Sequence, residues 1–209
     1  MKINMLKAAF AALFLYSTPA FATIITGAVT TGSGSFVNLS GTSGFSVGQN
    51  NFDDLNLYAF DEQQNVVLTE DVSVNIGSGI SAGSYISSHY LAFDPLNTAH
   101  QVGWVQFDSA IYGVATTSAL VSASAFLGAP GVTYLSPSLL GLEGGDSVWV
   151  DSNDNTKLWV DWTASNPGDY VRVFTDYSPA AAVPLPASAP LLLAALGLFA
   201  GVKRRRKIS

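Results

Sequence analysis

The sequence predicts an all-β fold, an antiparallel β-sandwich or jelly-roll-like domain, and three observations support this prediction. The central part of the chain is rich in Gly, Ser, Thr, Val and aromatic residues. Short runs of alternating or β-branched residues recur along it, and turn signals containing Gly, Asn, Asp or Pro separate them. Many short strands at such spacing are typical of two packed sheets.

Most of these runs have the pattern of a strand, and one segment has the pattern of a helix. In 118–127, Ser118 is a suitable N-cap residue, and Leu120, Val121 and Leu127 fall on one helical face. We therefore expect one β-rich domain, residues 23–179, with one short helix. The predicted strands are 36–39, 55–60, 66–69, 72–76, 85–93, 102–107, 111–115, 148–151, 158–163 and 170–175.

The charge of the chain is distributed unevenly. All 15 acidic residues lie between Asp53 and Asp176, where Lys157 and Arg172 are the two basic residues. This part therefore has a formal charge of −13, against −6 for the whole chain. Such a surface repels phosphate backbones, so we expect no nucleic-acid partner. The chain has no cysteine, so the domain depends on its hydrophobic core rather than on disulfides.

The N-terminus has the features of a secretory signal peptide. Lysines flank the start of the chain, an apolar run follows at 8–16, and Ala20 and Ala22 form an A-x-A cleavage site. The apolar run is too short for a membrane-spanning helix. We therefore expect residues 1–22 to be a signal peptide and the protein to be exported.

The C-terminal segment 180–209 differs from the rest of the chain. A Pro-containing motif at 183–187 precedes an uncharged run at 187–202 and five consecutive cations at 203–207. A helix over that run spans about 24 Å, and it could cross a ~30 Å hydrocarbon core with local thinning and snorkelling cations. A plain membrane anchor is the alternative. The motif is Val183, Pro184, Leu185, Pro186 and Ala187, and the basic stop is Lys203, Arg204, Arg205, Arg206 and Lys207.

This order of motif, apolar run and cations resembles the PEP-CTERM sorting signal in its VPLPA variant. Leu185 stands where the commonest form has a glutamate. The resemblance implies an exported protein of a Gram-negative bacterium, anchored in the inner membrane and then placed at the cell surface or in the extracellular matrix. It also implies processing of the tail by an exosortase-type transpeptidase, in a strain that makes exopolysaccharide.

Three segments of the central domain, 84–95, 131–134 and 167–173, are similar to ectodomains of uncharacterised PEP-CTERM proteins. This similarity favours one recurring β-rich ectodomain. It implies no activity.

Motifs for catalysis and zinc binding are weak. A G-x-S-x-G pattern surrounds Ser81, with Asp94 and His100 in hydrolase order, but a nucleophile elbow needs a following helix, and a strand is predicted at 85–93. His89 is expected mid-strand, in packing or a structural hydrogen bond, and His100 in a solvated turn. Because no Cys or H-x-x-x-H pair exists, zinc is not expected. We expect a protein that is not an enzyme.

Calcium is the one metal for which the sequence offers a pattern. Asp151, Asn153 and Asn155 alternate like the opening of a Ca²⁺ loop. However, Thr156 replaces the expected Gly, and Trp162 occupies the twelfth position in place of Glu. An ordinary hairpin turn is the favoured interpretation. No other cofactor is predicted.

The predicted hairpin 148–162 carries the strongest binding hypothesis. Because buried carboxylates are costly, strand alternation directs Trp149 and Trp159 outward, beside Asp151 and Asp161. Indoles beside carboxylates resemble a sugar-stacking platform. The alternative is a cross-strand pair that only stabilises the hairpin, by about 0.5–1.5 kcal/mol beyond area burial. The sequence thus favours a structural or adhesive protein, with an exopolysaccharide-binding module as the alternative.

Overall fold

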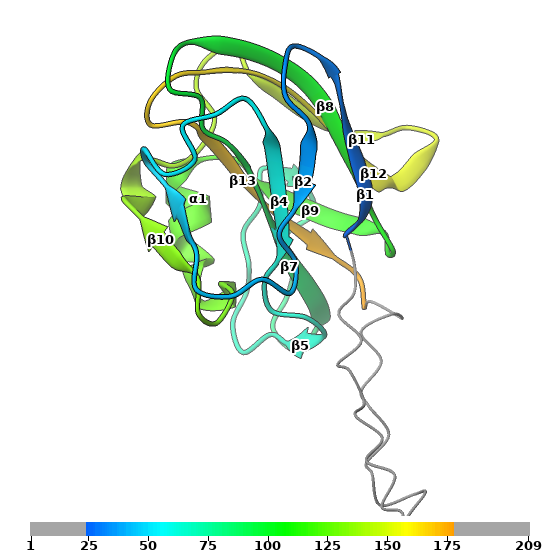
Figure 1. Ribbon diagram of the computed structural model, residues 1–209. Coiled ribbons are helices and arrows are strands. Elements are labelled where there is room, and N and C mark those ends of the chain that lie inside the picture. Colours follow the sequence, from blue (N-terminus) through cyan, green and yellow to red (C-terminus); the bar gives the residue numbers. More distant parts are fainter. Residues whose placement is uncertain (1–23, 178–209) are drawn as a thin grey trace, which may run out of the picture. The chain divides into compact units, whose positions relative to one another are not determined.

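The computed structural model describes residues 24–177, whose strands form three layers (Figure 1). The first layer, which we call the outer sheet, is antiparallel and has the strand order β1-β8-β12-β11. Its strands are β1 (Ile24–Thr31), β8 (Ala99–Phe107), β12 (Asp154–Ala164) and β11 (Ser147–Asp151).

The second layer, the central sheet, has the strand order β2-β4-β7-β13-β9-β6, with β5 also paired to β7. The β2–β4 pair is parallel, and the other pairs are antiparallel. Its strands are β2 (Phe36–Asn38), β4 (Leu57–Asp61), β7 (Tyr85–Phe93), β13 (Asp169–Thr175), β9 (Ile111–Ala115), β6 (Ile76–Gly77) and β5 (Val66–Val67).

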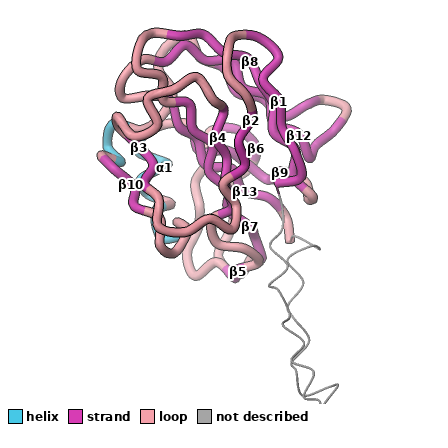
Figure 2. Tube along the Cα trace, in the orientation of Figure 1, coloured by secondary structure: helices cyan, strands magenta, loops and turns pink. Residues whose placement is uncertain are grey.

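The third layer, the cap layer, holds the short helices and a small parallel ribbon, on the side of the central sheet away from the outer sheet (Figure 2). It consists of α1 (Ser118–Ala123), η1 (Ala125–Leu127), η2 (Pro137–Leu139), β3 (Ser46–Gly48) and β10 (Thr133–Leu135).

Two hydrophobic cores separate the three layers. The first lies between the sheets and includes Phe93, Phe107 and Trp162. The second lies between the central sheet and the cap layer and includes Phe60 and Tyr90. The central strands are therefore covered on both faces, which is why every residue of β13 is buried, whereas burial alternates along β8.

The predicted β-sandwich with one short α-helix is confirmed, with corrections. Two strand pairs are parallel, and the strands at 24–31, 46–48 and 133–135 were not predicted. The predicted strand 72–76 is wrong, since that segment makes only a Val72–Ile80 bridge before the two-residue β6. The jelly-roll subclass stays a prediction.

The predicted helix 118–127 is two shorter pieces, and its cap lies one residue earlier. Thr117 is the N-cap, and its side chain accepts the N–H of Leu120. The Ser124 hydroxyl donates back to the carbonyls of Leu120 and Val121, and such competition with the backbone ends α1 before η1 begins. Val121 and Leu127 are buried as predicted, and Leu120 is partly buried.

The predicted signal peptide and sorting tail lie outside the described residues. Between Ile24 and Tyr177, no helix has both the length and the apolar character needed to cross a membrane.

Candidate functional site

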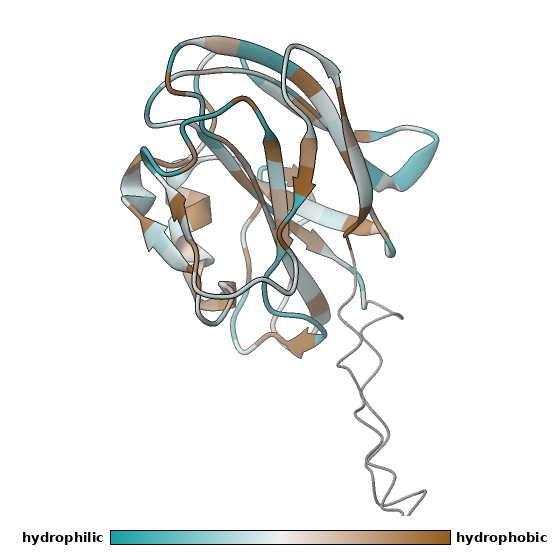
Figure 3. Ribbon diagram, in the orientation of Figure 1, coloured by the Kyte–Doolittle hydropathy of each residue, from teal (hydrophilic) through white to brown (hydrophobic). Residues whose placement is uncertain are grey.

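The outward face of the outer sheet is open to solvent, and it presents the predicted tryptophan pair. Leu158, Val160 and Trp162 point into the core and are fully buried. Trp149 and Trp159 alternate with them and point outward, as predicted. The tip of this β11–β12 hairpin is hydrophilic (Figure 3). The hairpin therefore has one apolar face and one accessible face.

The two indoles form a parallel pair. Trp149 lies directly opposite Trp159 in the β11–β12 register. Their ring centroids are 6.0 Å apart, and the ring planes differ by 4°. Trp149 is 41% exposed. Trp159 is only partly exposed, and each ring is the stacking partner of the other, which is the offset-stacked geometry that stabilises a hairpin.

A third tryptophan, which the sequence reasoning missed, extends this pair. Trp104 of β8 lies opposite Trp159 on the other side of β12. Trp149, Trp159 and Trp104 thus form a row across three adjacent strands, which we call the tryptophan row. The alternation of buried Val105 and Phe107 already placed Trp104 outward. What the sequence did not reveal is that β8 pairs with β12, since more than fifty residues separate Trp104 from Trp159.

Carboxylates flank the tryptophan row. Trp159 Nε1 donates to Asp151 Oδ2 at 2.9 Å. This hydrogen bond, followed by one from the Asn153 N–H, lowers the pKa of Asp151. Asp161 Oδ1 lies 2.8 Å from His100 Nε2, on the same face. His100 is therefore not simply solvated in a turn: it belongs to β8 and pairs with Asp161.

Asp151, Asn153 and Asn155, the residues of the calcium pattern, lie at the end of β11, in the hairpin turn and at the start of β12. Asp151 uses one oxygen for the N–H of Asn153 and the other for Trp159. Asn155 is already part of β12. Within residues 24–177, no three His, Asp or Glu side chains gather as a possible metal site. The geometry matches the hairpin-turn interpretation of these residues.

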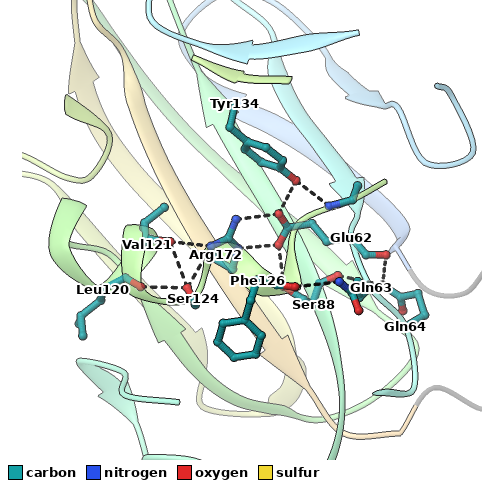
Figure 4. Close-up of polar contacts among 11 residues, drawn as sticks. Glu62, Gln63, Gln64, Ser88, Leu120, Val121, Ser124, Phe126, Tyr134 and Arg172 are labelled. Carbon is teal, nitrogen blue, oxygen red and sulfur yellow. Dashed lines mark hydrogen bonds and ion pairs between the residues drawn. The ribbon is translucent and has the colours of Figure 1, made fainter. Parts of the chain in front are cut away.

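The chemistry that the sequence did not reveal is a buried ion pair between the central sheet and the cap layer (Figure 4). Arg172 of β13 donates from Nε to Glu62 Oε2 at 2.6 Å and from Nη2 to Glu62 Oε1 at 2.8 Å. Both side chains are almost completely buried. Burial alone lowers the pKa of Arg172, but the Glu62 carboxylate more than offsets this, and the pKa is raised. The two parallel hydrogen bonds form the bidentate geometry typical of strong arginine–carboxylate pairs.

Further hydrogen bonds connect this ion pair to the cap layer. Arg172 Nη1 donates to the carbonyl of Val121 at 2.6 Å and to Ser124 Oγ at 3.0 Å, at the end of α1. The Tyr134 hydroxyl of β10 donates to Glu62 at 2.5 Å. Burial and the Glu62 carboxylate raise the pKa of Tyr134. The network thus anchors α1 and β10 to the sheet, which is a structural role.

His89 occupies a second buried polar array. Its Nδ1 lies 2.8 Å from Asp61 Oδ1, and its Nε2 lies 3.0 Å from Thr175 Oγ1. This carboxylate–imidazole–hydroxyl order resembles a catalytic triad, but Thr175 and His89 are fully buried, so no substrate reaches the hydroxyl. The predicted structural hydrogen bond of His89 is confirmed. Ser81 lies in the loop before β7, with no helix after it.

Asp169, at the start of β13, is a buried carboxyl that is poorly satisfied. Its Oδ2 atom has no hydrogen-bond partner among the described residues. Burial, and then the negative charges of Asp146 and Glu143, raise its pKa to about 8. The neutral acid is therefore the favoured form of Asp169 near neutral pH.

The remaining predicted site residues lie outside the described residues. They are the cleavage-site residues Ala20 and Ala22, the motif 183–187 and the basic stop 203–207. Comparison with curated proteins and with solved structures gave no match. Comparison with protein-family models gave a match at residues 182–207, to the PEP-CTERM protein-sorting motif. The chain thus carries a C-terminal PEP-CTERM sorting signal, a motif that indicates an exported protein.

Proposed function

We propose that an exosortase-type transpeptidase processes this exported chain at its C-terminal tail, and that the β-rich domain has a non-catalytic, structural or adhesive role. The domain would act at the cell surface or in the extracellular matrix of a Gram-negative bacterium. The observation that carries the proposal is the match of 182–207 to the sorting motif. The acidic composition of the domain, with 15 acidic residues against two basic ones, suits a hydrated destination outside the cell.

The non-catalytic part of the proposal is supported by where the polar chemistry lies. The two buried polar networks, around His89 and around Arg172, lie within the layers and are occupied by internal hydrogen bonds. Their geometry serves to hold strands and cap segments together. The accessible groups lie on the open face of the outer sheet, where they favour binding.

The test is the intact mass of the protein isolated separately from its native envelope and from the medium, with glycan analysis. The proposal expects a chain that ends near 183–187, with or without an added group. A mass extending through Ser209 in every fraction would contradict processing and leave a plain membrane-anchored domain.

A second candidate function is binding of exopolysaccharide at the open face. The specific observation in its favour is the Trp149–Trp159 pair on this face, with Trp149 exposed and Asp151 and Asp161 nearby. Sugar CH groups stack on such rings, and hydroxyls donate to such carboxylates. The full-length protein is expected to be retained by exopolysaccharide from the native strain, and a Trp149→Ala/Trp159→Ala variant to be released. Equal retention of both would exclude this role for the pair.

A further inference from the structure

We infer that β11, an edge strand of the outer sheet, binds β11 of a second copy of this chain, antiparallel and with Trp149 of the two copies directly opposite each other. The two four-stranded outer sheets then continue as one sheet across a two-fold axis. The inference names a partner that the structural or adhesive role proposed above leaves open. It does not depend on how the C-terminal tail is processed.

The outer edge of β11 is free in the single chain. Within residues 24–177, β11 pairs with β12 and with no other strand. Its outward backbone N–H and C=O groups therefore lack a strand partner, and such an edge is a template for another strand. Its five residues include no proline and no lysine, which commonly protect an edge. The edge is thus open to pairing.

The opposite edge of the same sheet, β1, is engaged within the chain. β1 lies beside β2 (Figure 1), and the Phe36 ring of β2 lies against Gly27. Asn38, also of β2, donates from Nδ2 to the carbonyl of Ile24 at 3.2 Å. A second copy therefore uses the β11 edge. Because both copies contribute the same strand, the assembly closes at two copies and does not grow into a fibre.

The sequence around β11 is complementary to its own reverse. It reads Asp-Ser-Val-Trp-Val-Asp-Ser over residues 146–152. Pairing about Trp149 places each acid of this segment opposite a serine and each valine opposite a valine. The pairs are Ser147 with the partner's Asp151, Val148 with the partner's Val150, and Asp146 with the partner's Ser152. No carboxylate faces another carboxylate, and each serine hydroxyl can donate to the acid opposite it.

Neighbouring registers are less favourable. Because paired residues lie on the same face of a sheet, one strand can shift against the other only by two residues at a time. One such shift places Trp149 opposite the partner's Ser147, and the reverse shift places it opposite the partner's Asp151. Both shifts lose the contact between the two rings, and the second sets the indole against a charge. The register with its axis at Trp149 is therefore favoured.

This register fills both faces of the joined sheet. On the solvent side, Trp149 stacks on Trp159 of its own chain and is still 41% exposed. The partner's Trp149 adds the same cross-strand ring contact from the free edge. On the core side, Val148 and Val150 are only partly buried and pack against the first core. The partner's valines cover the apolar surface that they leave in the single chain.

The acidity of the domain sets the strength of this contact. The described residues include 15 acidic and two basic ones, so two copies repel each other at long range. Salt screens this repulsion. A contact along one strand of five residues, about 17 Å long, is also small among protein interfaces. The dimer is therefore weak, reversible and tighter at high salt.

The test is sedimentation velocity of the full-length protein in detergent solution, over a range of protein concentrations, at low and at high salt. We expect a concentration-dependent shift from monomer to dimer that increases with salt. Trp149→Lys and Trp149→Glu each place like charges opposite each other at the axis, so each variant alone should associate at least about tenfold more weakly. An equal mixture of the two variants should recover association, because a lysine then faces a glutamate.

A third variant should increase the association instead. Ser147→Lys places an ammonium opposite the partner's Asp151 on both sides of the axis, so association should tighten about two- to tenfold. The control is Thr26→Lys, which adds the same charge at an exposed position of β1. It measures the gain that comes from the lower net charge alone, and Ser147→Lys should exceed it.

The outcomes decide on the interface and on its register. A monomer at every concentration and salt would overturn the inference. Association that survives in both Trp149 variants, or that does not return when the two are mixed and circular dichroism shows them folded, would place the interface elsewhere. If Ser147→Lys associates no more tightly than Thr26→Lys, the pairing of Ser147 with the partner's Asp151 is wrong. Processing of the tail is tested separately, by intact mass.

Discussion

The outer and central sheets are built from similar strands but bury their residues in different ways. In the central sheet, β13 is buried along its whole length, because the outer sheet covers one face and the cap layer covers the other. In the outer sheet, burial alternates along β8 and β12, because one face remains in solvent. The polar chemistry is divided in the same way: the central sheet holds internal networks, and the outer sheet presents accessible groups.

This difference separates groups that determine stability from groups that are free to bind. A buried charge such as Arg172 depends on its partners, because no water replaces them. Removing an exposed ring such as Trp149 lowers the free energy of unfolding only a little, because folding buries only part of the ring's apolar surface. Mutations on the two sheets should therefore differ in their cost to the free energy of unfolding, and the following predictions rank that cost.

The largest effect is expected for Glu62→Ala, in the network behind the central sheet. The substitution leaves the Arg172 guanidinium buried and without its carboxylate, and it also removes the acceptor of Tyr134. Breaking one partner of a buried ion pair typically costs about 3–5 kcal/mol. Urea unfolding followed by tryptophan fluorescence measures the loss. Glu70→Ala, at an exposed position, is the control and should change the free energy little.

A companion variant separates charge from packing at the same site. In Glu62→Leu/Arg172→Met, both charges are replaced by apolar groups, and such replacements of whole buried pairs are often neutral. The double variant should therefore be more stable than Glu62→Ala. If both variants lose the same free energy, packing rather than the unpaired charge sets the cost.

The next effect is a gain, expected for Asp169→Asn. Since the pKa of Asp169 is raised to about 8 from its ordinary 3.8, the folded chain binds more protons than the unfolded chain between these values. The free energy of unfolding therefore falls as the pH rises through this window. Removing the ionisable group should stabilise the protein by about 1–3 kcal/mol at pH 8.

The pH dependence is the decisive measurement for Asp169. The difference between Asp169→Asn and the unmodified protein should be small near pH 4 and grow toward pH 8. Asp53→Asn, at an exposed position, should show no such growth. A constant difference across the pH range would mean that Asp169 is ionised throughout and that its burial does not set its pKa.

The same division explains what could be predicted from the sequence. The inward and outward side chains of the β11–β12 hairpin, including Trp149 and Trp159, could be predicted from alternation, because one face of that sheet is exposed to solvent. The β1 strand and the small β3–β10 ribbon were missed, since their short or Gly- and Thr-rich segments lack such alternation. The sorting motif is a local pattern, and its prediction was confirmed.

The buried networks could not be predicted, because they join residues far apart in the chain. Glu62 and Arg172 are 110 residues apart and meet only when β4 and β13 take their places around β7. Trp104 likewise joins Trp159 only through the β8–β12 pairing. Because β13 is buried on both faces, its residues show no alternation that would mark Arg172 as buried.

A smaller effect is expected for Trp149→Ala, on the edge strand of the outer sheet. The ring packs on Trp159 at 6.0 Å but keeps 41% of its surface exposed. Loss of an aromatic pair costs about 0.5–1.5 kcal/mol beyond area burial. Thermal unfolding measures the change, and Tyr85→Ala is the matched exposed control. A loss as large as that of Glu62→Ala would place Trp149 among the residues that build the core and weaken its assignment as a binding residue.

The smallest effect is expected for His100→Gln, which removes the imidazole beside Asp161. The two side chains lie 2.8 Å apart, but they are 50% and 44% exposed, so water replaces most of what the contact provides. Even a fully charged pair at such an exposed position contributes only about 0–1 kcal/mol, and salt screens it. Unfolding in low and high salt should therefore give nearly the same free energy for the variant and the unmodified protein. A loss of several kcal/mol would mean that an exposed contact on the outer sheet contributes as much to stability as the buried contacts of the central sheet. The difference that we draw between the two sheets would then be wrong.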